Sequence, residues 1–330
     1  MSAPTLTWDD FGALCRAAVR GAGGSVRTAR ALASSIVAAE EHGRREVGAA
    51  HLLDYLDALR DGRLVGDAEP IVRHPRGSSV LVDAAGGTAQ AAFDEAFPTV
   101  VSAAAQAGVA VLSIRDSYSA GELGYYARRL AAEGLVALVC ANSPALMSVY
   151  SASAPVTGTN PMAFALPHPA GPRSFDQASS ATAWVSVRQA ATDGRAIPEG
   201  WAVDADGEPT TDPDAALAGA LLPFGGAKGS NVAMMIEMLA VLSGADFSAD
   251  AAPFDSGSTP PRLGMFVLAL DPAAFDSGYV ERVERHLRAV AEAHGADFGR
   301  RHATPAHVEL DEQVHAVLRA AAQGDAGVSR

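Results

Sequence analysis

The sequence predicts an α/β fold, with a central α/β segment at residues 71–275 flanked by helical segments at 1–70 and 276–330. Within the central segment, short runs of β-branched and apolar residues end in turn residues and alternate with stretches of helical periodicity. In the two end segments, apolar residues recur at the three- and four-residue spacing of amphipathic helices. Because short amphipathic helices need partners for their apolar faces, we expect the two ends of the chain to pack together.

The first sixty residues contain three helix patterns with recognisable ends. Thr7 can cap the first helix, with Asp10 as its capping partner, and Ser25 can cap the second, which Gly43 ends. The third pattern ends at Gly62. In the tail, residues 279–295 and 310–322 have the same periodicity. The tail helices could pack back on the N-terminal ones.

Five apolar runs in the central segment predict strands, because each is short and is bounded by Gly, Pro, Asn or Asp. They lie at residues 78–87, 108–117, 134–143, 160–167 and 264–272. Helices are predicted between them at 93–108 and 121–134, and a strongly apolar one at 223–244. The order of these elements is typical of a sheet covered by helices.

Composition and charge exclude several classes of function. Hydrophobic residues make up 48% and charged residues 19% of 330, as expected of a folded protein rather than a disordered one. A formal net charge of −13 with no basic stripe argues against nucleic acid or an anionic membrane as partner. The N-terminal residues lack the pattern of a signal peptide and the two cysteines form no disulfide framework, so we expect a cytoplasmic protein.

The common nucleotide and metal motifs are not matched. Residues 21–26, "GAGGSV", lack a preceding strand and the last glycine of a dinucleotide fingerprint, and 225–230, "GGAKGS", depart from a phosphate loop. Gly225 and Gly226 are either a plain helix entry or, with Lys228, an anion site at a helix N-terminus. The nine histidines form no metal motif, so we expect no metal.

Two polar turns are better candidates for a site. In "VTGTNPMAF", Asn160 precedes Pro161 and is expected to be extended, with Gly158 and Thr159 exposing amide donors beside a strand. Taken by itself this stretch is more simply a turn. In "FDQASS", Asp176 follows an apolar residue, where a carboxylate usually caps a helix or binds a specific group.

Four blocks in this order and spacing resemble the malate/L-lactate dehydrogenase family of NAD(P)-dependent oxidoreductases: "GTNPMAFALP", "FDQASSATA", "IPEGWAVDADGEPTTDP" and "LPFGGAKGSNVAMMIEML". The pairing of "FDQAS" with "PFGGxKGS" looks most like the Δ1-piperideine-2-carboxylate/Δ1-pyrroline-2-carboxylate reductase branch. The resemblance implies a non-Rossmann nucleotide-binding α/β domain, a helical domain joining both termini, NADPH or NADH as cofactor, a small-molecule substrate and a homodimer.

The resemblance also assigns residues by position. Thr159 matches a substrate-contacting threonine of the family. The cofactor-binding positions that it implies are Ser119, Ala120, Gly121, Glu122, Leu123, Asp176, Gln177, Ala178, Ala227, Lys228 and, in the tail, Arg301.

The positions that carry acid chemistry in the family are changed in this sequence. The family's histidine in the turn after the second strand aligns with Ser119, its proton-donating histidine with Val47, and its carboxylate-binding arginine with His51. Glu46, His51 and Tyr118 are the three side chains nearby that could supply a proton instead. The alternative for Glu46 and His51 is that they only favour the start of a helix, and for Tyr118 that it packs.

These changes favour one reaction over another. Oxidising a hydroxy acid needs a base, which is worth roughly 10²–10⁴-fold, and Val47 cannot be one. A protonated C=N bond already carries its proton and needs only hydride. We therefore expect an NAD(P)H-dependent reductase of a C=N bond next to a carboxylate. The alternatives are a non-redox member of the family, which binds a ligand or catalyses cyclisation or elimination, and a 2-hydroxy-acid dehydrogenase.

Overall fold

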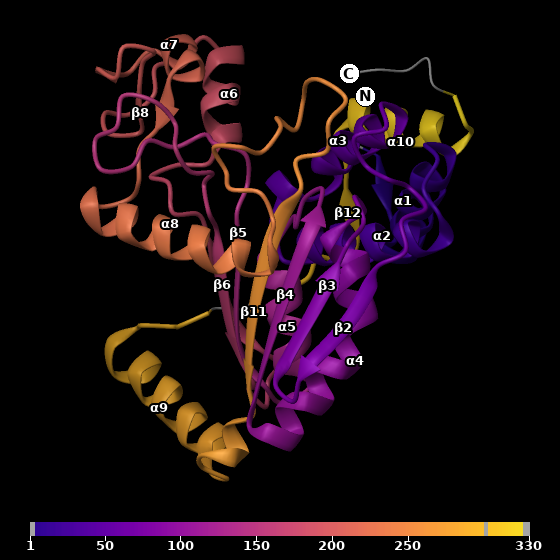
Figure 1. Ribbon diagram of the computed structural model, residues 1–330, viewed down its shortest axis with the longest axis vertical. Coiled ribbons are helices and arrows are strands. Elements are labelled where there is room, and N and C mark those ends of the chain that lie inside the picture. Colours follow the sequence, from indigo (N-terminus) through magenta and orange to yellow (C-terminus); the bar gives the residue numbers. More distant parts are fainter. Residues whose placement is uncertain (1–3, 300–302, 326–330) are drawn as a thin grey trace.

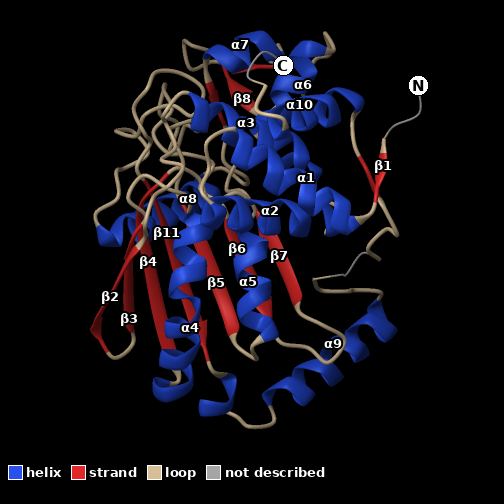
Figure 2. Ribbon diagram, turned by 90° about the vertical axis from the view of Figure 1, so that its right-hand side faces the viewer, coloured by secondary structure: helices blue, strands red, loops and turns tan. Residues whose placement is uncertain are grey.

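A computed structural model describes residues 4–299 and 303–325. Its centre is a seven-stranded mixed sheet of order β2-β3-β4-β11-β5-β6-β7 (Figure 2). The strands are β2 Ile71–Arg76, β3 Ser79–Asp83, β4 Val109–Ser117, β5 Val136–Ala141, β6 Met162–Leu166, β7 Arg173–Gln177 and β11 Leu263–Leu270. The strands β3 and β4 run parallel, and the other neighbours are antiparallel. The predicted α/β class is confirmed.

Helices cover the two faces of this sheet unequally. The helices α4 Ala89–Ala107 and α5 Leu123–Ala132 pack on one face and bury the main core with it. The helix α8 Ala227–Ala240 crosses part of the other face, over Cys140 and Phe266. Alternation along β11 accounts for this arrangement, because Met265 and Val267 point to α4 and α5 while Phe266 points to α8.

The helical domain is built from both ends of the chain, as predicted. It contains α1 Trp8–Gly21, α2 Val26–Glu41, the 3₁₀ turn η1 Arg45–Val47, α3 Ala49–Arg60 and α10 Glu312–Ala322. Strand β1 Thr5–Leu6 pairs with β12 Val308–Glu309, and Leu318 of α10 is buried in one cluster with Phe11 and Leu52. Thr7 and Ser25 cap α1 and α2 as the sequence predicts, since each side chain accepts a backbone N–H three residues on.

The first tail helix lies elsewhere, which corrects the expectation that both tail helices return to the N-terminal helices. The helix α9 Tyr279–His294 stands at the far end of the sheet from α1 (Figure 1), and none of its residues is buried. The course of β11 explains its place. Leu270 ends that strand beside Val109 and Val136, where β4 and β5 begin. After the 3₁₀ turn η3 Pro272–Ala274, the chain therefore enters α9 at the end of the sheet opposite the helical domain.

A smaller unit completes the fold. It comprises α6 Trp184–Thr192, β8 Ala202–Val203, β9 Pro209–Thr210, α7 Pro213–Ala218 and β10 Ala220–Leu221, and it has its own apolar cluster. The 3₁₀ turn η2 Val241–Ser243 follows α8. Across residues 4–299 and 303–325, no helix combines the length and apolarity needed to cross a membrane.

Candidate active site

The turn that joins β4 to α5, residues 118–122, is the centre of the candidate site. Tyr118 N donates to Gly87 O at 2.9 Å, and Gly121 N donates to Ser119 Oγ at 3.3 Å. Gly121 has φ +63°, and a Cβ there would lie 3.0 Å from Gln90 Nε2. Because both the conformation and the space favour glycine, the turn keeps a shape that other residues would strain.

Asp176, at the end of β7, is brought to this turn. Its Oδ2 accepts the amide N–H of Gly124 at 2.8 Å, so it satisfies the first turn of α5, where Glu122 makes no side-chain cap. Arg44 Nη1 donates to the carbonyl of Asp176 at 3.2 Å. Burial raises the pKa of Asp176 from 3.8 to about 6, against the opposing effects of Gly124 and Arg44. The predicted positions Ser119–Leu123 and Asp176 therefore form one local structure.

Glu122 is committed to an internal ion pair. Its two carboxylate oxygens accept from the guanidinium of Arg128 at 2.8 and 2.9 Å, and its side chain is 1% exposed. Its neighbours in the turn are more available, since Ala120 is partly exposed. The side chain of Glu122 thus supports the shape of the turn.

A second cluster continues from Asp176 towards α8. Ser179 N donates to Thr159 O at 2.8 Å, and Phe224 N donates to Ser179 O at 3.0 Å. One turn beyond Phe224, Lys228 lies exposed in the first turn of α8. Through these bonds and the bond from Gly124 to Asp176, the segment 176–179 links the turn 118–122 and the start of α5 with Thr159 and the start of α8. These linked segments are called the strip below.

The turn at Asn160 differs from its predicted conformation. Asn160 is expected to be extended before Pro161, but its φ is +34°, in the left-handed region. The side chain explains this, because Asn160 Nδ2 donates to Ala233 O at 2.9 Å and to Glu237 Oε2 at 2.7 Å, both in α8. These buried bonds hold the backbone where local preference alone would not.

The N-terminus of α8 has the geometry of an anion site. Gly225 and Gly226 have φ of +58° and +61°, and no atom lies within 4 Å of where a Cβ would be at either glycine. No side chain caps this helix end. Free amides and the positive end of the helix dipole favour a phosphate group there, and Lys228, the single lysine in the sequence, adds a charge. The residues present therefore fit a dinucleotide.

The three candidate acids lie on the side of the site formed by the helical domain. Glu46 is in η1, with Oε1 2.8 Å from Arg44 Nε. His51 is in the first turn of α3, and its Nδ1 lies 2.9 Å from Asp54 Oδ2. Tyr118 is buried in the turn itself.

The sequence did not indicate four side chains that connect these parts, namely Arg44, Asp54, Tyr55 through its hydroxyl group, and Gln90. Gln90 Nε2 donates to Tyr55 Oη and to Ala120 O, both at 3.1 Å, and so joins α3 to the turn. The partners of Gln90 are 30 and 35 residues away in sequence, and no local pattern indicates them. Asp54 could have been found, because residues three apart on a helix are neighbours. Arg301 lies outside the described residues.

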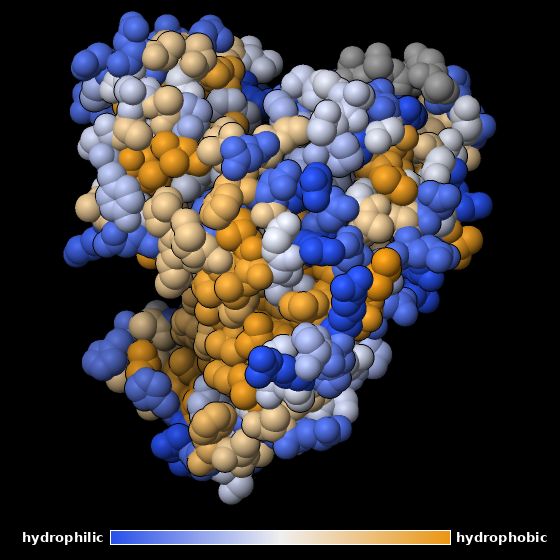
Figure 3. Space-filling view, in the orientation of Figure 1, coloured by the Kyte–Doolittle hydropathy of each residue, from blue (hydrophilic) through white to orange (hydrophobic). Residues whose placement is uncertain are grey.

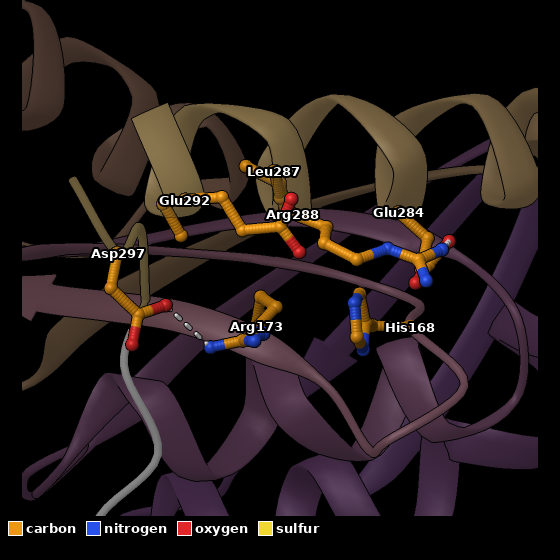
Figure 4. Close-up of a pocket in the computed structure, with 8 residues that line it drawn as sticks. His168, Arg173, Glu284, Leu287, Arg288, Glu292 and Asp297 are labelled. Atoms are coloured by element: carbon orange, nitrogen blue, oxygen red, sulfur yellow. Dashed lines mark hydrogen bonds and ion pairs between the residues drawn. The ribbon is translucent and has the colours of Figure 1, made fainter. Parts of the chain in front are cut away.

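A separate cavity of about 310 Å³ lies between β7 and α9 (Figure 4). Its charged side chains are paired within it. Arg173 Nη1 donates to Asp297 at 2.9 Å, and Arg288 Nη2 donates to Glu284 at 2.7 Å. Both arginines of the cavity are thus paired with carboxylates, Glu292 adds a further negative charge, and none of the predicted site residues lines the cavity. Among the described residues, no group of three metal-binding side chains is assembled.

Comparisons with known proteins give one consistent result. A family model described as malate/L-lactate dehydrogenase matches residues 6–317. The (2R)-3-sulfolactate dehydrogenase (NADP(+)) of Chromohalobacter salexigens is 38% identical over 88% of this chain and 90% of its own length. The Δ1-pyrroline-2-carboxylate/Δ1-piperideine-2-carboxylate reductase of Pseudomonas putida is 39% identical over 87% of each chain.

A solved structure agrees over nearly the whole fold. The Δ1-piperideine-2-carboxylate reductase from Pseudomonas syringae pv. tomato matches with a TM-score of 0.84 and 33% identity, covering 99% of this chain and 96% of that chain. The family predicted from four sequence blocks is thus confirmed. The chain belongs to the malate/L-lactate dehydrogenase family of oxidoreductases.

Proposed function

We propose that this protein reduces the C=N bond of a cyclic imine next to a carboxylate, with NADPH or NADH as the hydride donor. One observation carries the proposal: the turn 118–122, Asp176, Thr159 and the N-terminus of α8 form one strip, although they lie far apart in sequence. The relatives support the reaction, since the reductases from Pseudomonas putida and Pseudomonas syringae are named for the five- and six-membered cyclic imines of this kind.

The residues of the strip divide into two binding functions. The amides of Gly226 and Ala227, with Lys228, would hold phosphate, while residues 119–123 and 176–178 would hold the remainder of the dinucleotide. When bound, the cofactor supplies the hydride. Thr159, whose carbonyl accepts from Ser179 N, belongs to the same strip and would bind the substrate. Holding two reactants in one geometry is the larger part of catalysis for a hydride transfer.

The proton requirement separates imine reduction from alcohol oxidation. Val47 stands in η1, where the family has its proton donor, and an aliphatic side chain cannot take a proton from a hydroxyl group. Imine reduction asks for one proton on nitrogen, which is basic enough to take it from solvent or from a moderate acid. Glu46, His51 and Tyr118 are the side chains proposed to supply it.

A second candidate is a 2-hydroxy-acid dehydrogenase, which oxidises the hydroxy acid or reduces the matching keto acid. The sulfolactate dehydrogenase is as similar to this chain as the imine reductases are. The change at Val47 weighs against it for the reason above. His51 in place of arginine removes a permanent cation that would bind a 2-carboxylate, and this change affects the imine and the hydroxy acid alike.

A homodimer is part of the proposal. Figure 3 shows a hollowed apolar surface between α8 and α9, on the sheet face that α8 leaves partly open. Met235 and Met238 of α8 are 47% and 48% exposed, and Leu242 is 63% exposed. The helix α9 is amphipathic and isolated, so its apolar stripe needs a partner. A second copy brings both an apolar face and an apolar helix, which supports a two-fold pair.

The function is tested by binding and then by turnover. Titration with NADPH and with NADH, followed by nucleotide fluorescence, should show binding of at least one. Assays with Δ1-piperideine-2-carboxylate, pyruvate and oxaloacetate should then show oxidation of the cofactor with the imine and not with the two keto acids. Binding without turnover of any of the three would refute the proposed substrate class, and no binding at all would refute the proposed redox function.

A further inference from the structure

The contacts of Glu46, His51 and Tyr118 show which of them can give up a proton. Glu46 Oε1 lies 2.8 Å from Arg44 Nε, and the same arginine donates to the carbonyl of Asp176. This contact is an ion pair without hydrogen-bond geometry. The carboxylate of Glu46 is therefore the charge partner of Arg44, and a proton on it would remove that attraction.

Tyr118 keeps its proton for another reason. Its side chain is buried, its hydroxyl donates to the carbonyl of Phe254 at 3.2 Å, and Arg63 Nη1 lies 3.4 Å from the same oxygen. Burial raises the pKa of Tyr118 well above its ordinary value, although Arg63 opposes the shift. Arg63 also donates to Phe254 O, so the hydroxyl belongs to an anchor that joins the loop before β11 to the helical domain.

Resting on the proposed function, we propose that His51 donates the proton to the imine nitrogen and that Asp54 is its positioning residue. His51 Nδ1 lies 2.9 Å from Asp54 Oδ2, and the histidine side chain is 25% exposed, so a ligand can reach it. An ionised carboxylate only accepts hydrogen bonds, so Nδ1 carries the hydrogen in this pair. In the proposal, the other ring nitrogen, Nε2, is the atom that donates to the substrate, because the pairing at Nδ1 fixes the tautomer of the neutral ring.

The imidazole is also held in place relative to the cofactor turn. Its ring packs edge-on against Tyr55, with centroids 5.0 Å apart. Tyr55 Oη accepts from Gln90 Nε2, which also donates to the carbonyl of Ala120. A Cβ at Gly121 would come within 3.3 Å of Tyr55 Oη, so the two elements are in close contact. His51 is thereby fixed to the turn through one aromatic contact and one bridging amide.

Reduction of the C=N bond adds one hydride to carbon and one proton to nitrogen. The imidazolium form of His51 carries hydrogen on both nitrogens. As the imine carbon accepts hydride, the nitrogen takes the Nε2 proton, so that an N–H bond forms on the substrate and the Nε2–H bond breaks. The products are the cyclic amine, the oxidised nicotinamide that gave the hydride, and a neutral histidine whose hydrogen stays on Nδ1 and is hydrogen-bonded to Asp54. The partly exposed ring then regains a proton from water.

The pairing of His51 with Asp54 can be tested in the free protein, independently of activity. Nuclear magnetic resonance correlations from ¹⁵N-labelled histidine report which ring nitrogen is protonated, and H51Q identifies the His51 signals. In the wild type, the neutral form of His51 should carry its hydrogen on Nδ1. In D54A it should shift to Nε2. The matched control is D57A, since Asp57 pairs with Arg60 on the same helix at the same three-residue spacing. It should keep the wild-type pattern.

Kinetics complete the test. With Δ1-piperideine-2-carboxylate and NADPH or NADH, H51Q should lower kcat by about 10²-fold while its affinity for the cofactor is unchanged. D54A should lower kcat by a smaller factor, D54E should recover part of the loss, and D57A should match the wild type. Nε2-protonated His51 in the wild type, an unchanged tautomer in D54A, or full activity in H51Q would each overturn the inference. A wild type that binds neither nucleotide would instead refute the proposed function.

Discussion

The carboxylate of Glu237 in α8 accepts a hydrogen bond from Asn160 Nδ2 at 2.7 Å, between residues 77 positions apart. The same carboxylate accepts Ser248 N at 2.6 Å and Ser248 Oγ at 2.7 Å, and Glu237 is 3% exposed. This buried acceptor therefore holds two loops on one helix. Because Asn160 follows Thr159 directly, the network sets where the proposed substrate-binding threonine lies.

Removing that acceptor should cost both stability and substrate affinity. Glu237→Ala removes the acceptor of Ser248 N and Ser248 Oγ and leaves Asn160 Nδ2 only its bond to Ala233 O, so it should lower the free energy of unfolding by about 3 kcal/mol or more. Glu237→Gln keeps one oxygen but places an amide among donors, so its loss should be smaller. Urea denaturation measures the first effect, and the KM for the imine measures the second. A variant as stable as the wild type would show that the network contributes little.

Asp176 should make the stability of the protein depend on pH. Its pKa is raised from 3.8 in the unfolded chain to about 6 in the folded one, mainly by burial. The stability linked to this group is therefore fully present below pH 3.8 and is lost as the pH rises through about 6. Asp176→Asn has no charge to bury, so at pH 8 it should exceed the wild type by up to about 3 kcal/mol.

Urea denaturation of the Asp176→Asn variant at a series of pH values checks this. The advantage over the wild type should shrink as the pH falls from 7 towards 4, where the wild-type carboxyl group is itself neutral. An advantage that stays constant across this range would contradict the burial argument. The variant should also bind NADPH or NADH more weakly, because Asp176 orients the first turn of α5.

The pair Glu122–Arg128 should show the energetics of a buried ion pair. Arg128→Met leaves the carboxylate, whose side chain is 1% exposed, without its partner and should destabilise the protein by about 3–5 kcal/mol. The double variant Glu122→Gln/Arg128→Met removes the stranded charge and should recover much of the loss. Thermal or urea unfolding of the two single variants and the double variant gives the coupling. Additive losses would indicate that the pair is not coupled.

Lys228 gives a direct probe of the site, because the sequence has one lysine. Reductive methylation with ¹³C-formaldehyde should yield one dimethyl-lysine signal apart from that of the N-terminal amine. Addition of NADPH should shift this lysine signal, and Lys228→Ala should remove it and weaken binding by about tenfold or more. A signal that stays in place while NADPH binds would exclude Lys228 from the phosphate site.

Local patterns in the sequence predicted more of the fold than of the site. The caps at Thr7 and Ser25 and the strand runs depend on neighbouring residues, and the structure has them as predicted. The position of α9 depends on which end of the sheet β11 leaves, which no local pattern encodes. The same holds for the site. Asn160 has φ +34° because of bonds to α8, and Gln90 reaches Ala120 across 30 residues.

The family resemblance supplied what local patterns could not, namely that the separated blocks meet. It also marked the replaced positions, and the structure adds the contacts there: Arg44 for Glu46 and Asp54 for His51. The resemblance indicated neither of these partners, and the folded chain shows them.

The central claim is that this site transfers hydride to the carbon of a C=N bond. Its most direct test is a reaction of Δ1-piperideine-2-carboxylate with NADPH or NADH deuterated at the transferring carbon, with mass spectrometry of the product. The account predicts one deuterium in the cyclic amino acid, at the carbon that bears the carboxylate, together with oxidation of the cofactor. A product without deuterium, or an imine left unreduced while the nucleotide is bound, would contradict it.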